Sequence, residues 1–440
     1  MAKVRIMMVV PATAPLRQMS PLMMNDARRK IPERPASVPD VVSLDHSFAP
    51  VPIARTGFTA NLAFATARRS PEFIVRGEVD SEHLPALAAS DHKVFSDPRI
   101  AAFPTCPDDA AVGTVSDVAG ALRIDQLHAM GLKGEKVAIA IMDTGINQAH
   151  LNGLGVLSKI DKTITWSPQG VAKTPGKYPV HHGTMCAFDA AIAAPNATLL
   201  DFPILLSTAS GASPMEGFLS DAVEAYSYLL QQMRLNTWPF DGLVINNSWG
   251  MYNQSWDFPP GDPGRYADNP NHPFNTIVGT LSRAGADILF AAGNCGADCP
   301  AGDCEGVTKD TIMGANAHPD VLTIAGATYL NDRVGYSSQG PAIAGMKHTK
   351  PDLTCYTHFT GSNAFGASIP DNGTSAACPV AAGCIAALRT GLPASRLSPG
   401  DLMREILADT RQADGSSGWN ADYGYGIFNP VNTASRLHIA

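Results

Sequence analysis

Short apolar runs alternate with helical patterns along most of this chain, and the alternation limits the folds that it can adopt. The runs at 137–142, 243–246 and 288–292 are short and largely apolar, and the first contains several β-branched residues, as expected of strands that are buried on both faces. Helical patterns at 221–233 and 275–284 lie between or beside them. Strands that alternate with helices pack as a parallel sheet between helical layers. We therefore predict a three-layer α/β/α fold with a mostly parallel central sheet.

Polar residues follow closely after two of the expected strands. Asp143 comes after the run at 137–142, and Asn294 comes after the run at 288–292. His182 opens a helical stretch of small residues through Gly183 and Thr184. In open α/β sheets, ligands bind beyond the carboxyl ends of the strands. These side chains therefore have a physical reason to converge at one edge of the sheet.

A glycine-rich turn places Ser375 at the start of an apolar helical run at 380–388. A serine hydroxyl is a poor nucleophile unless a base stands beside it. The start of a helix also offers backbone N–H groups and a positive potential to an oxyanion. Taken alone, a serine before a helix is more simply explained as an N-cap. The rest of the chain decides between these interpretations.

Asp143, His182 and Ser375 follow one another in the order that subtilisin uses for its catalytic triad. The chain resembles the subtilisin-like serine peptidases, the subtilases, from about residue 120 to its C-terminus. Four motifs in family order carry this resemblance: Asp-Thr-Gly-Ile at 143–146, His-Gly-Thr at 182–184, Ala-Ala-Gly-Asn at 291–294 and Gly-Thr-Ser-Ala-Ala-Cys-Pro-Val-Ala-Ala-Gly at 373–383.

The resemblance implies a role for each matching side chain. Ser375 would attack the scissile carbonyl, His182 would take its proton, and Asp143 would orient the imidazole and stabilise its charged form. Asn294 would donate a hydrogen bond to the oxyanion beside the Ser375 N–H group. Without the other motifs, Asn294 would be interpreted as a turn residue after a strand.

The resemblance also assigns two segments to substrate binding. Ser248, Trp249 and Gly250 would pair with the backbone of an extended substrate, and Ala291, Ala292 and Gly293 would line the primary specificity pocket. The Trp249 side chain could narrow the cleft or could be a packed aromatic. Both alternatives remain open from the sequence.

Two other histidines do not fit the motif as well as His182 does. His181 is the rival base, but only His182 stands directly before Gly-Thr, so we expect His181 to flank the site. The resemblance gives His150 a packing role. We predict no cofactor and no metal ligand. The stretch after 188 is too short for the calcium-binding loop of many relatives, and Asn147 and Asn152 stand where relatives often carry carboxylates.

Three of the eight cysteines, Cys295, Cys299 and Cys304, follow directly after Asn294. Structural zinc sites usually draw paired ligands from two places, and no second pair with a nearby histidine is apparent. We expect a disulfide that fixes a loop beside the active site, or reduced thiols. Cys186, Cys378 and Cys384 lie in small-residue helical runs and are expected to act as small hydrophobic residues.

The N-terminal residues form a separate region in this interpretation. We predict an N-terminal region over 1–115 and a catalytic domain over 116–440. Strands are expected at 73–79 and from 92, with a helix over 81–89 between them that Ser81 caps. Proline-rich stretches at 32–35 and 103–107 are interpreted as linkers. Many subtilases carry a small α+β prodomain that blocks the cleft, so the resemblance implies an intramolecular inhibitor. An accessory domain that is never removed is the alternative.

The composition of the chain argues against two classes of binding partner. The formal net charge of −8 and the lack of a concentrated Lys/Arg run argue against nucleic acid. No apolar segment has the length needed to cross a bilayer, so no membrane partner is expected. The apolar run after Met1 is too short for a convincing signal peptide, which favours the cytoplasm over secretion. The expected partner is a polypeptide substrate.

These inferences predict a serine endopeptidase that works through an acyl-enzyme intermediate. Two alternatives remain. The same triad could pass the acyl group to an amine, as in a peptide-processing acyl transferase or macrocyclase. The fold could also serve as a non-catalytic peptide-binding module, although the complete set of Asp143, His182, Ser375 and Asn294 argues against this.

Overall fold

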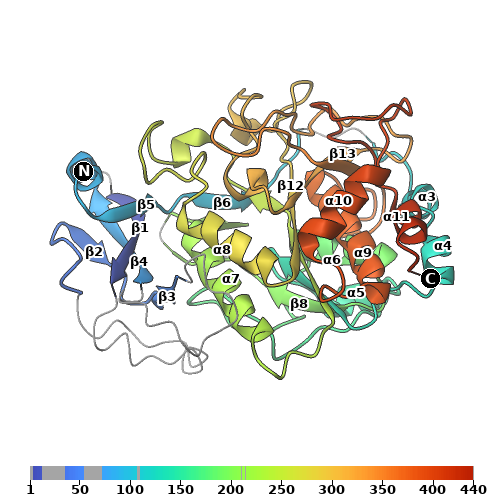
Figure 1. Ribbon diagram of the computed structural model, residues 1–440, viewed down its shortest axis with the longest axis horizontal. Coiled ribbons are helices and arrows are strands. Elements are labelled where there is room, and N and C mark those ends of the chain that lie inside the picture. Colours follow the sequence, from blue (N-terminus) through green and yellow to red (C-terminus); the bar gives the residue numbers. More distant parts are fainter. Residues whose placement is uncertain are drawn as a thin grey trace.

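The chain forms a small sheet from its N-terminal residues and a larger sheet from the rest. The computed structural model describes residues 3–11, 35–53, 72–106, 110–209, 211–213 and 215–439. The N-terminal sheet lies at the left end of Figure 1, and the last helix, α11 (Pro430–Arg436), lies at the right end. None of the helices within these ranges is both long and apolar enough to cross a membrane.

The larger sheet has six parallel strands in the order β14-β13-β12-β10-β7-β8. Nearly all of their residues are buried, which explains why the sequence shows them as continuous apolar runs. The parallel sheet predicted from the sequence is confirmed. The strands are β7 (Val137–Met142), β8 (Thr198–Phe202), β10 (Gly242–Asn247), β12 (Ala286–Ala291), β13 (Leu322–Ala327) and β14 (Leu353–Tyr356).

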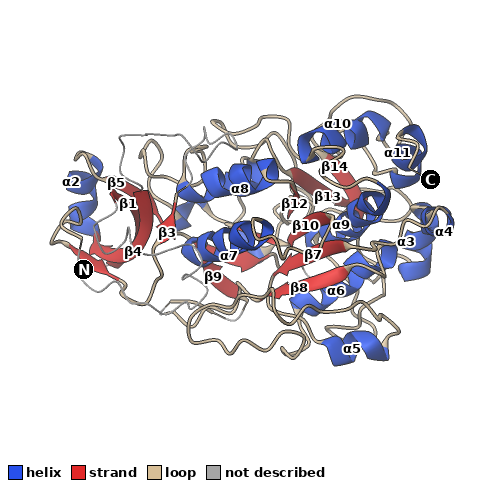
Figure 2. Ribbon diagram, turned by 60° about the horizontal axis from the view of Figure 1, so that its bottom comes forward, coloured by secondary structure: helices blue, strands red, loops and turns tan. Residues whose placement is uncertain are grey.

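Helices cover both faces of this sheet, as the predicted three layers require. In β7, Ala138 and Ala140 belong to the core on one face, whereas Ile139 and Ile141 belong to the core on the other. Figure 2 shows α7 (Leu219–Met233) and α8 (Pro273–Arg283) on one side of the sheet, and α6 and α9 on the other. The remaining helices of this part are α3 (Val115–Ala121), α4 (Ile124–Ala129), α5 (Gln148–Gly153) and α10 (Pro399–Asp409).

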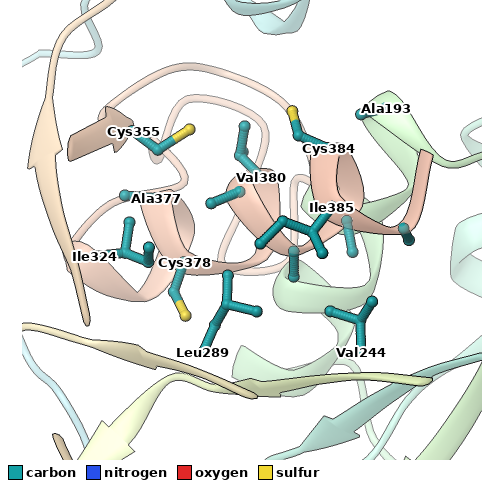
Figure 3. Close-up of a cluster of buried hydrophobic side chains, with 14 of the residues drawn as sticks. Ala193, Val244, Leu289, Ile324, Cys355, Ala377, Cys378, Val380, Cys384 and Ile385 are labelled. Carbon is teal, nitrogen blue, oxygen red and sulfur yellow. The ribbon is translucent and has the colours of Figure 1, made fainter. Parts of the chain in front are cut away.

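Helix α9 (Thr374–Gly391) is buried along almost its whole length and packs against α6 (His182–Ala193). A Cβ atom on Gly383 would lie 2.2 Å from the carbonyl oxygen of Ala190, so only glycine permits this approach. Figure 3 shows Ile385 and Cys378 of α9 facing Val244 and Leu289 of the sheet.

The predicted hydrophobic cysteines are indeed buried and free. Burial raises the pKa of the Cys186, Cys378 and Cys384 thiols well above their usual range, so all three remain uncharged. Cys355 belongs to the same class: it is buried in β14, and burial also raises the pKa of its thiol. Each therefore fills space in the core as a small apolar side chain.

The N-terminal sheet is antiparallel, with the order β2-β4-β1-β5 and with β3 paired to β4. Its strands at 73–79 and from 92 are confirmed. The strands are β1 (Lys3–Pro11), β2 (Val42–Leu44), β3 (Val51–Pro52), β4 (Glu72–Asp80) and β5 (Lys93–Ser96).

The helix predicted over 81–89 is split, and its predicted cap is wrong. A 3-10 turn, η2 (Ser81–His83), precedes α2 (Leu84–Ala88), and neither element has a side-chain cap. Asp80, not Ser81, holds the N-cap position of the first turn. Pro85 lies in the first turn of α2, where its missing N–H group is tolerated, so the α-helix begins there rather than at Ser81. Of the linker predicted at 32–35, only Pro35 lies within the described residues.

One face of the N-terminal sheet packs on α7. Met7 and Ile74 share a hydrophobic core with residues of α7 and α8. The Arg76 guanidinium of β4 lies 2.9 Å from Asp221 of α7 and 2.7 Å from Asp45 of its own region. Asp97 accepts hydrogen bonds from the N–H and hydroxyl groups of Ser220, which lies in the first turn of α7. The N-terminal region is therefore docked by a buried core and by buried charges.

A third sheet connects the two parts. β6 (Arg99–Ala102) runs antiparallel between β11 (Trp249–Gly250) and β9 (Glu216–Phe218). The linker predicted at 103–107 is wrong for Phe103 to Cys106, because Asn294, Asn372 and Cys299 hold these residues in place. Pro107 lies outside the described residues.

A buried ion pair joins α9 to the central sheet, and its loss should destabilise the fold. Arg389 makes two hydrogen bonds of 2.6 Å to Asp287 of β12. Asp287→Ala would leave the guanidinium buried without its carboxylate, so we expect the free energy of unfolding to fall by about 3–5 kcal/mol. Arg283→Ala removes an exposed ion pair with Asp320 and should cost less than about 1 kcal/mol. Denaturant titration of both variants measures this difference; equal losses would contradict it.

Candidate active site

Asp143 and His182 meet at the carboxyl edge of the central sheet. Asp143 directly follows β7, and His182 is the first residue of α6. His182 Nδ1 lies 2.9 Å from both carboxylate oxygens of Asp143, and both side chains are buried. The Thr144 N–H group also donates to the Asp143 carboxylate. A carboxylate at Nδ1 holds the imidazole in the tautomer whose Nε2 can accept a proton.

Ser375 is the second residue of α9, directly after a turn in which Gly373 has φ 75°. Its hydroxyl donates to the carbonyl of Ser248 at 3.4 Å, and the Ser248 hydroxyl donates to the Ser375 carbonyl at 2.9 Å. His182 Nε2 is buried and has no hydrogen-bond partner in the described part of the chain. The serine hydroxyl is thus hydrogen-bonded to Ser248 rather than to His182.

Cys186 lies between these residues, which the sequence did not indicate. Its sulfur is 3.6 Å from the Ser375 carbonyl oxygen, 3.6 Å from Asp143 Oδ2 and 3.8 Å from His182 Nδ1. Asp143, His182 and Cys186 have a spacing that could suit a metal ion. Burial raises the pKa of this thiol well above its usual range, so the sulfur is uncharged. The direct Asp143–His182 hydrogen bond fits a proton relay better.

Asn294 lies three residues beyond β12 and points into the same site. Its Oδ1 atom accepts hydrogen bonds from the N–H group of Thr374 at 2.9 Å and from its hydroxyl at 3.1 Å. These contacts fix which end of the amide faces the cleft. Nδ2 donates to the carbonyl oxygens of Phe103 at 3.1 Å and Pro104 at 2.9 Å. An amide that donates to a backbone carbonyl beside Ser375 meets the geometric requirement for an oxyanion donor.

The backbone predicted to bind substrate is already paired with another part of this chain. In the antiparallel register, Gly250 lies opposite Ala101 and Trp249 lies opposite Ala102. On the other edge of β6, Ile100 lies opposite Gly217. An extended peptide that adds a strand to a sheet edge binds in this way. Residues 99–102 thus pair with this backbone as a bound peptide strand would.

Phe103 fills the predicted specificity pocket. A Cβ atom on Gly250 would lie 2.6 Å from its ring, and one on Gly293 would lie 3.4 Å from it, so the ring is held between two glycine backbones. The ring also meets Tyr252 edge to face, with 4.5 Å between the centroids. Only 8% of Phe103 is exposed. The pocket therefore accepts a large aromatic side chain.

The model of the subtilase family (Peptidase_S8) matches residues 134–426. This chain belongs to the subtilase family. The resemblance seen in the sequence is confirmed, and the parallel sheet between helical layers is the fold that it implied.

Subtilases from distant organisms align with much of this chain. Endoprotease bli-4 of Caenorhabditis elegans is 24% identical over 324 residues, which cover 70% of this chain and 32% of that protein. Subtilisin E of Bacillus subtilis is 25% identical over 314 residues, which cover 70% and 68%. Furin of Bos taurus is 24% identical over 277 residues, which cover 60% and 31%. The aligned part spans about a third of the length of endoprotease bli-4 and of furin.

The Trp249 side chain of this subtilase is a packed aromatic rather than part of the cleft. It is fully buried and contacts the rings of Phe274 and Phe290. Asn316, which the sequence did not single out, donates to the carbonyls of both Trp249 and Ala291. This amide therefore joins β11 to the end of β12 and fixes the distance between these two segments.

The other histidines lie beside the site and do not hydrogen-bond to Asp143. The His181 ring packs edge to face on Phe365 at 5.3 Å, and burial lowers its pKa. His150 Nε2 lies 2.7 Å from the Ser362 carbonyl oxygen. Both positions agree with the flanking and packing roles expected from the sequence.

Disulfides, rather than reduced thiols, occupy the cysteine cluster of this subtilase. Cys295 pairs with Cys304, which closes the loop directly after Asn294. Cys299 of the same loop pairs with Cys106, which lies two residues beyond Pro104. The first bond was expected from the sequence in general terms. The second was not, because its partners are 193 residues apart.

Proposed function

We propose that this subtilase is a serine endopeptidase that hydrolyses peptide bonds through an acyl-enzyme intermediate. One arrangement carries the proposal: the Asp143–His182 hydrogen bond lies beside Ser375 at a helix start, and the Asn294 amide donates to a peptide carbonyl in the cleft. None of these features is by itself specific to a peptidase, because each also occurs in proteins without this activity. The combination suits acyl transfer from a bound peptide.

The proposed mechanism begins with the rotation of the Ser375 hydroxyl from Ser248 toward His182. His182 Nε2 takes the hydroxyl proton while Ser375 Oγ bonds to the scissile carbon, and Asp143 stabilises the imidazolium. The oxyanion accepts hydrogen bonds from Asn294 Nδ2 and from the Ser375 N–H group at the start of α9. The C–N bond then breaks, and His182 protonates the leaving amine. Water, deprotonated by His182, releases the acyl group by the reverse sequence.

Substrate recognition in this proposal relies on backbone pairing. An extended peptide would take the place of β6 between Ser248-Trp249-Gly250 and β9, and its side chain before the scissile bond would enter the pocket walled by Ala291-Ala292-Gly293. Hydrogen bonds to the main chain provide affinity for many sequences, whereas the pocket provides selectivity.

We further propose that the N-terminal region is an intramolecular inhibitor. Residues 99–104 fill the cleft, and the N-terminal sheet holds them there through α7. A substrate can bind only after this segment leaves. This occupation favours the inhibitor over an accessory domain that merely packs on the enzyme.

The proposal is tested by hydrolysis of a peptide library in H₂¹⁸O, with products analysed by mass spectrometry. Because the cleft is occupied, the Arg76→Ala chain, which loses a buried ion pair of the docking interface, is assayed beside the wild type. A hydrolase places ¹⁸O in each new carboxylate, and Ser375→Ala abolishes the products. Products joined to an added amine would instead indicate an acyl transferase. Peptides that are bound but never cut would indicate a binding module.

Asn294 gives a prediction specific to this mechanism. Asn294→Ala removes a donor that acts mainly on the transition state, so kcat should fall about 10²- to 10³-fold with little change in KM, as in subtilisin, from which this magnitude is taken. Asn196→Ala, which removes a surface hydrogen bond to Glu135, should leave both constants unchanged. Both variants are measured in the Arg76→Ala chain. A rise in KM at constant kcat would assign Asn294 to substrate binding instead.

A further inference from the structure

Ala101 and Ala102 pair with β11, and the register of this pairing identifies which peptide bond of the segment 99–104 faces Ser375. Ala101 lies opposite Gly250 and Ala102 lies opposite Trp249, so Phe103 comes next, beside Ser248. The Phe103 ring fills the pocket, and its carbonyl accepts a hydrogen bond from Asn294 Nδ2. Asn294 also contacts the Pro104 carbonyl, but the register and the pocket both place Phe103 on the acyl side. The bond presented to Ser375 is therefore Phe103–Pro104.

We propose that Phe103–Pro104 is a substrate bond that this enzyme cannot cut, so that the N-terminal region stays covalently attached as a permanent latch on the cleft. This inference rests on the proposed peptidase function and specifies how that function is regulated. Proline on the leaving side makes the segment a substrate mimic, and its removal from the cleft requires undocking rather than self-cleavage.

The chemistry of the leaving group explains why this bond would persist. When Ser375 Oγ bonds to the Phe103 carbonyl carbon, the C–N bond can break only if the nitrogen lone pair receives the proton held by His182. In proline the nitrogen carries Cδ in place of hydrogen, and the ring restricts the inversion that would turn the lone pair toward the imidazole. The proton then returns to Oγ, the Oγ–C bond breaks, and the peptide is restored.

Contacts on both sides of the bond hold it in place. On the acyl side, β6 pairs with two strands, and Tyr252 Oη donates to the carbonyl of Ala102. On the leaving side, Asn372 Nδ2 donates to Thr105 Oγ1 at 3.3 Å, and Cys106 is joined to Cys299. An amine that is formed there would stay beside the acyl-enzyme at a high effective concentration, which favours resynthesis of the bond.

The decisive experiment replaces the leaving residue in the full chain. Wild type, Pro104→Ala and Pro104→Ala/Ser375→Ala are purified, incubated and examined by N-terminal sequencing and by mass under reducing conditions. We expect Pro104→Ala to yield a second N-terminus at position 104. The double variant and the wild type should keep this bond.

A second measurement does not depend on how the variant folds. A synthetic peptide that copies residues 97–105 is added to the Arg76→Ala chain, together with a version that carries alanine at position 104. The natural peptide should inhibit and be recovered whole, whereas the alanine version should be cut after its phenylalanine.

The outcomes separate the latch from the proposed function. Cleavage of Phe103–Pro104 in the wild type would overturn the latch, and so would recovery of the alanine peptide uncut while library peptides are hydrolysed. If no form hydrolyses any peptide, the peptidase proposal fails, and the latch fails with it.

Discussion

Ser375→Ala is expected to lower kcat for peptide hydrolysis by about 10⁶-fold, the size of the loss when subtilisin loses its nucleophile. The reason is that the neighbouring hydroxyl at the start of α9, that of Thr374, is already held by Asn294 and by the Gly293 N–H group. The variant is assayed in the Arg76→Ala chain with a peptide that this chain hydrolyses. Ser398→Ala, which removes only the N-cap of α10, serves as the control and should retain full activity.

His182 should behave as part of the same unit as Ser375. His182→Ala alone is expected to cost about as much as Ser375→Ala, and the double variant should cost no more than either, because the nucleophile and its base act together. Losses that multiply in the double variant would mean that the two side chains act independently. That result would contradict the proton relay.

Arg76→Ala should raise the rate of peptide hydrolysis by increasing the fraction of molecules whose cleft is open. It leaves the Asp221 carboxylate, whose side chain is 5% exposed, without its cation at the docking interface. Breaking a buried pair costs about 3–5 kcal/mol, which corresponds to a rise of roughly 140- to 3,700-fold in the fraction of open molecules. The initial rate of hydrolysis of a short peptide should rise accordingly, until the open form predominates.

A matched control lies in the same region. Lys93→Ala removes an exposed ion pair with Glu72, 2.8 Å long, and should change the rate by less than about fivefold. The gain for Arg76→Ala should also shrink at lower pH, because burial already raises the pKa of Asp221, and a protonated Asp221 no longer needs the guanidinium. Equal rates for wild type and Arg76→Ala would mean that this pair does not hold the cleft closed.

The core of the fold could be predicted because its signals are local. The run at 137–142 is buried on both faces, so its sequence alone shows a strand, and a residue directly after it must lie at the carboxyl edge. The positions of His182 and Ser375 at helix starts followed from the glycine-containing turns around them. These features depend on neighbours in sequence, and the family motifs added their roles.

The contents of the cleft could not be predicted because they depend on distant partners. Phe103 and Pro104 stand in a proline-rich stretch that is typical of a linker, and their binding partners lie at 249–250 and 293–294. The Cys106–Cys299 bond and the Cys186 contacts join segments whose separation conceals the pairing. The role of Trp249 also depends on distant partners. The sequence allowed its side chain either to narrow the cleft or to pack in the core, and its contacts with Phe274 and Phe290 show that it packs.

The central claim is that Ser375 is the nucleophile, and a fluorophosphonate probe tests it most directly. The probe is added to the Arg76→Ala chain, and the modified residue is located by peptide mapping. The account predicts one adduct, on Ser375, that is absent from Arg76→Ala/Ser375→Ala and slower to form in the wild type. An adduct on another residue, or peptide hydrolysis that survives without Ser375, would contradict it.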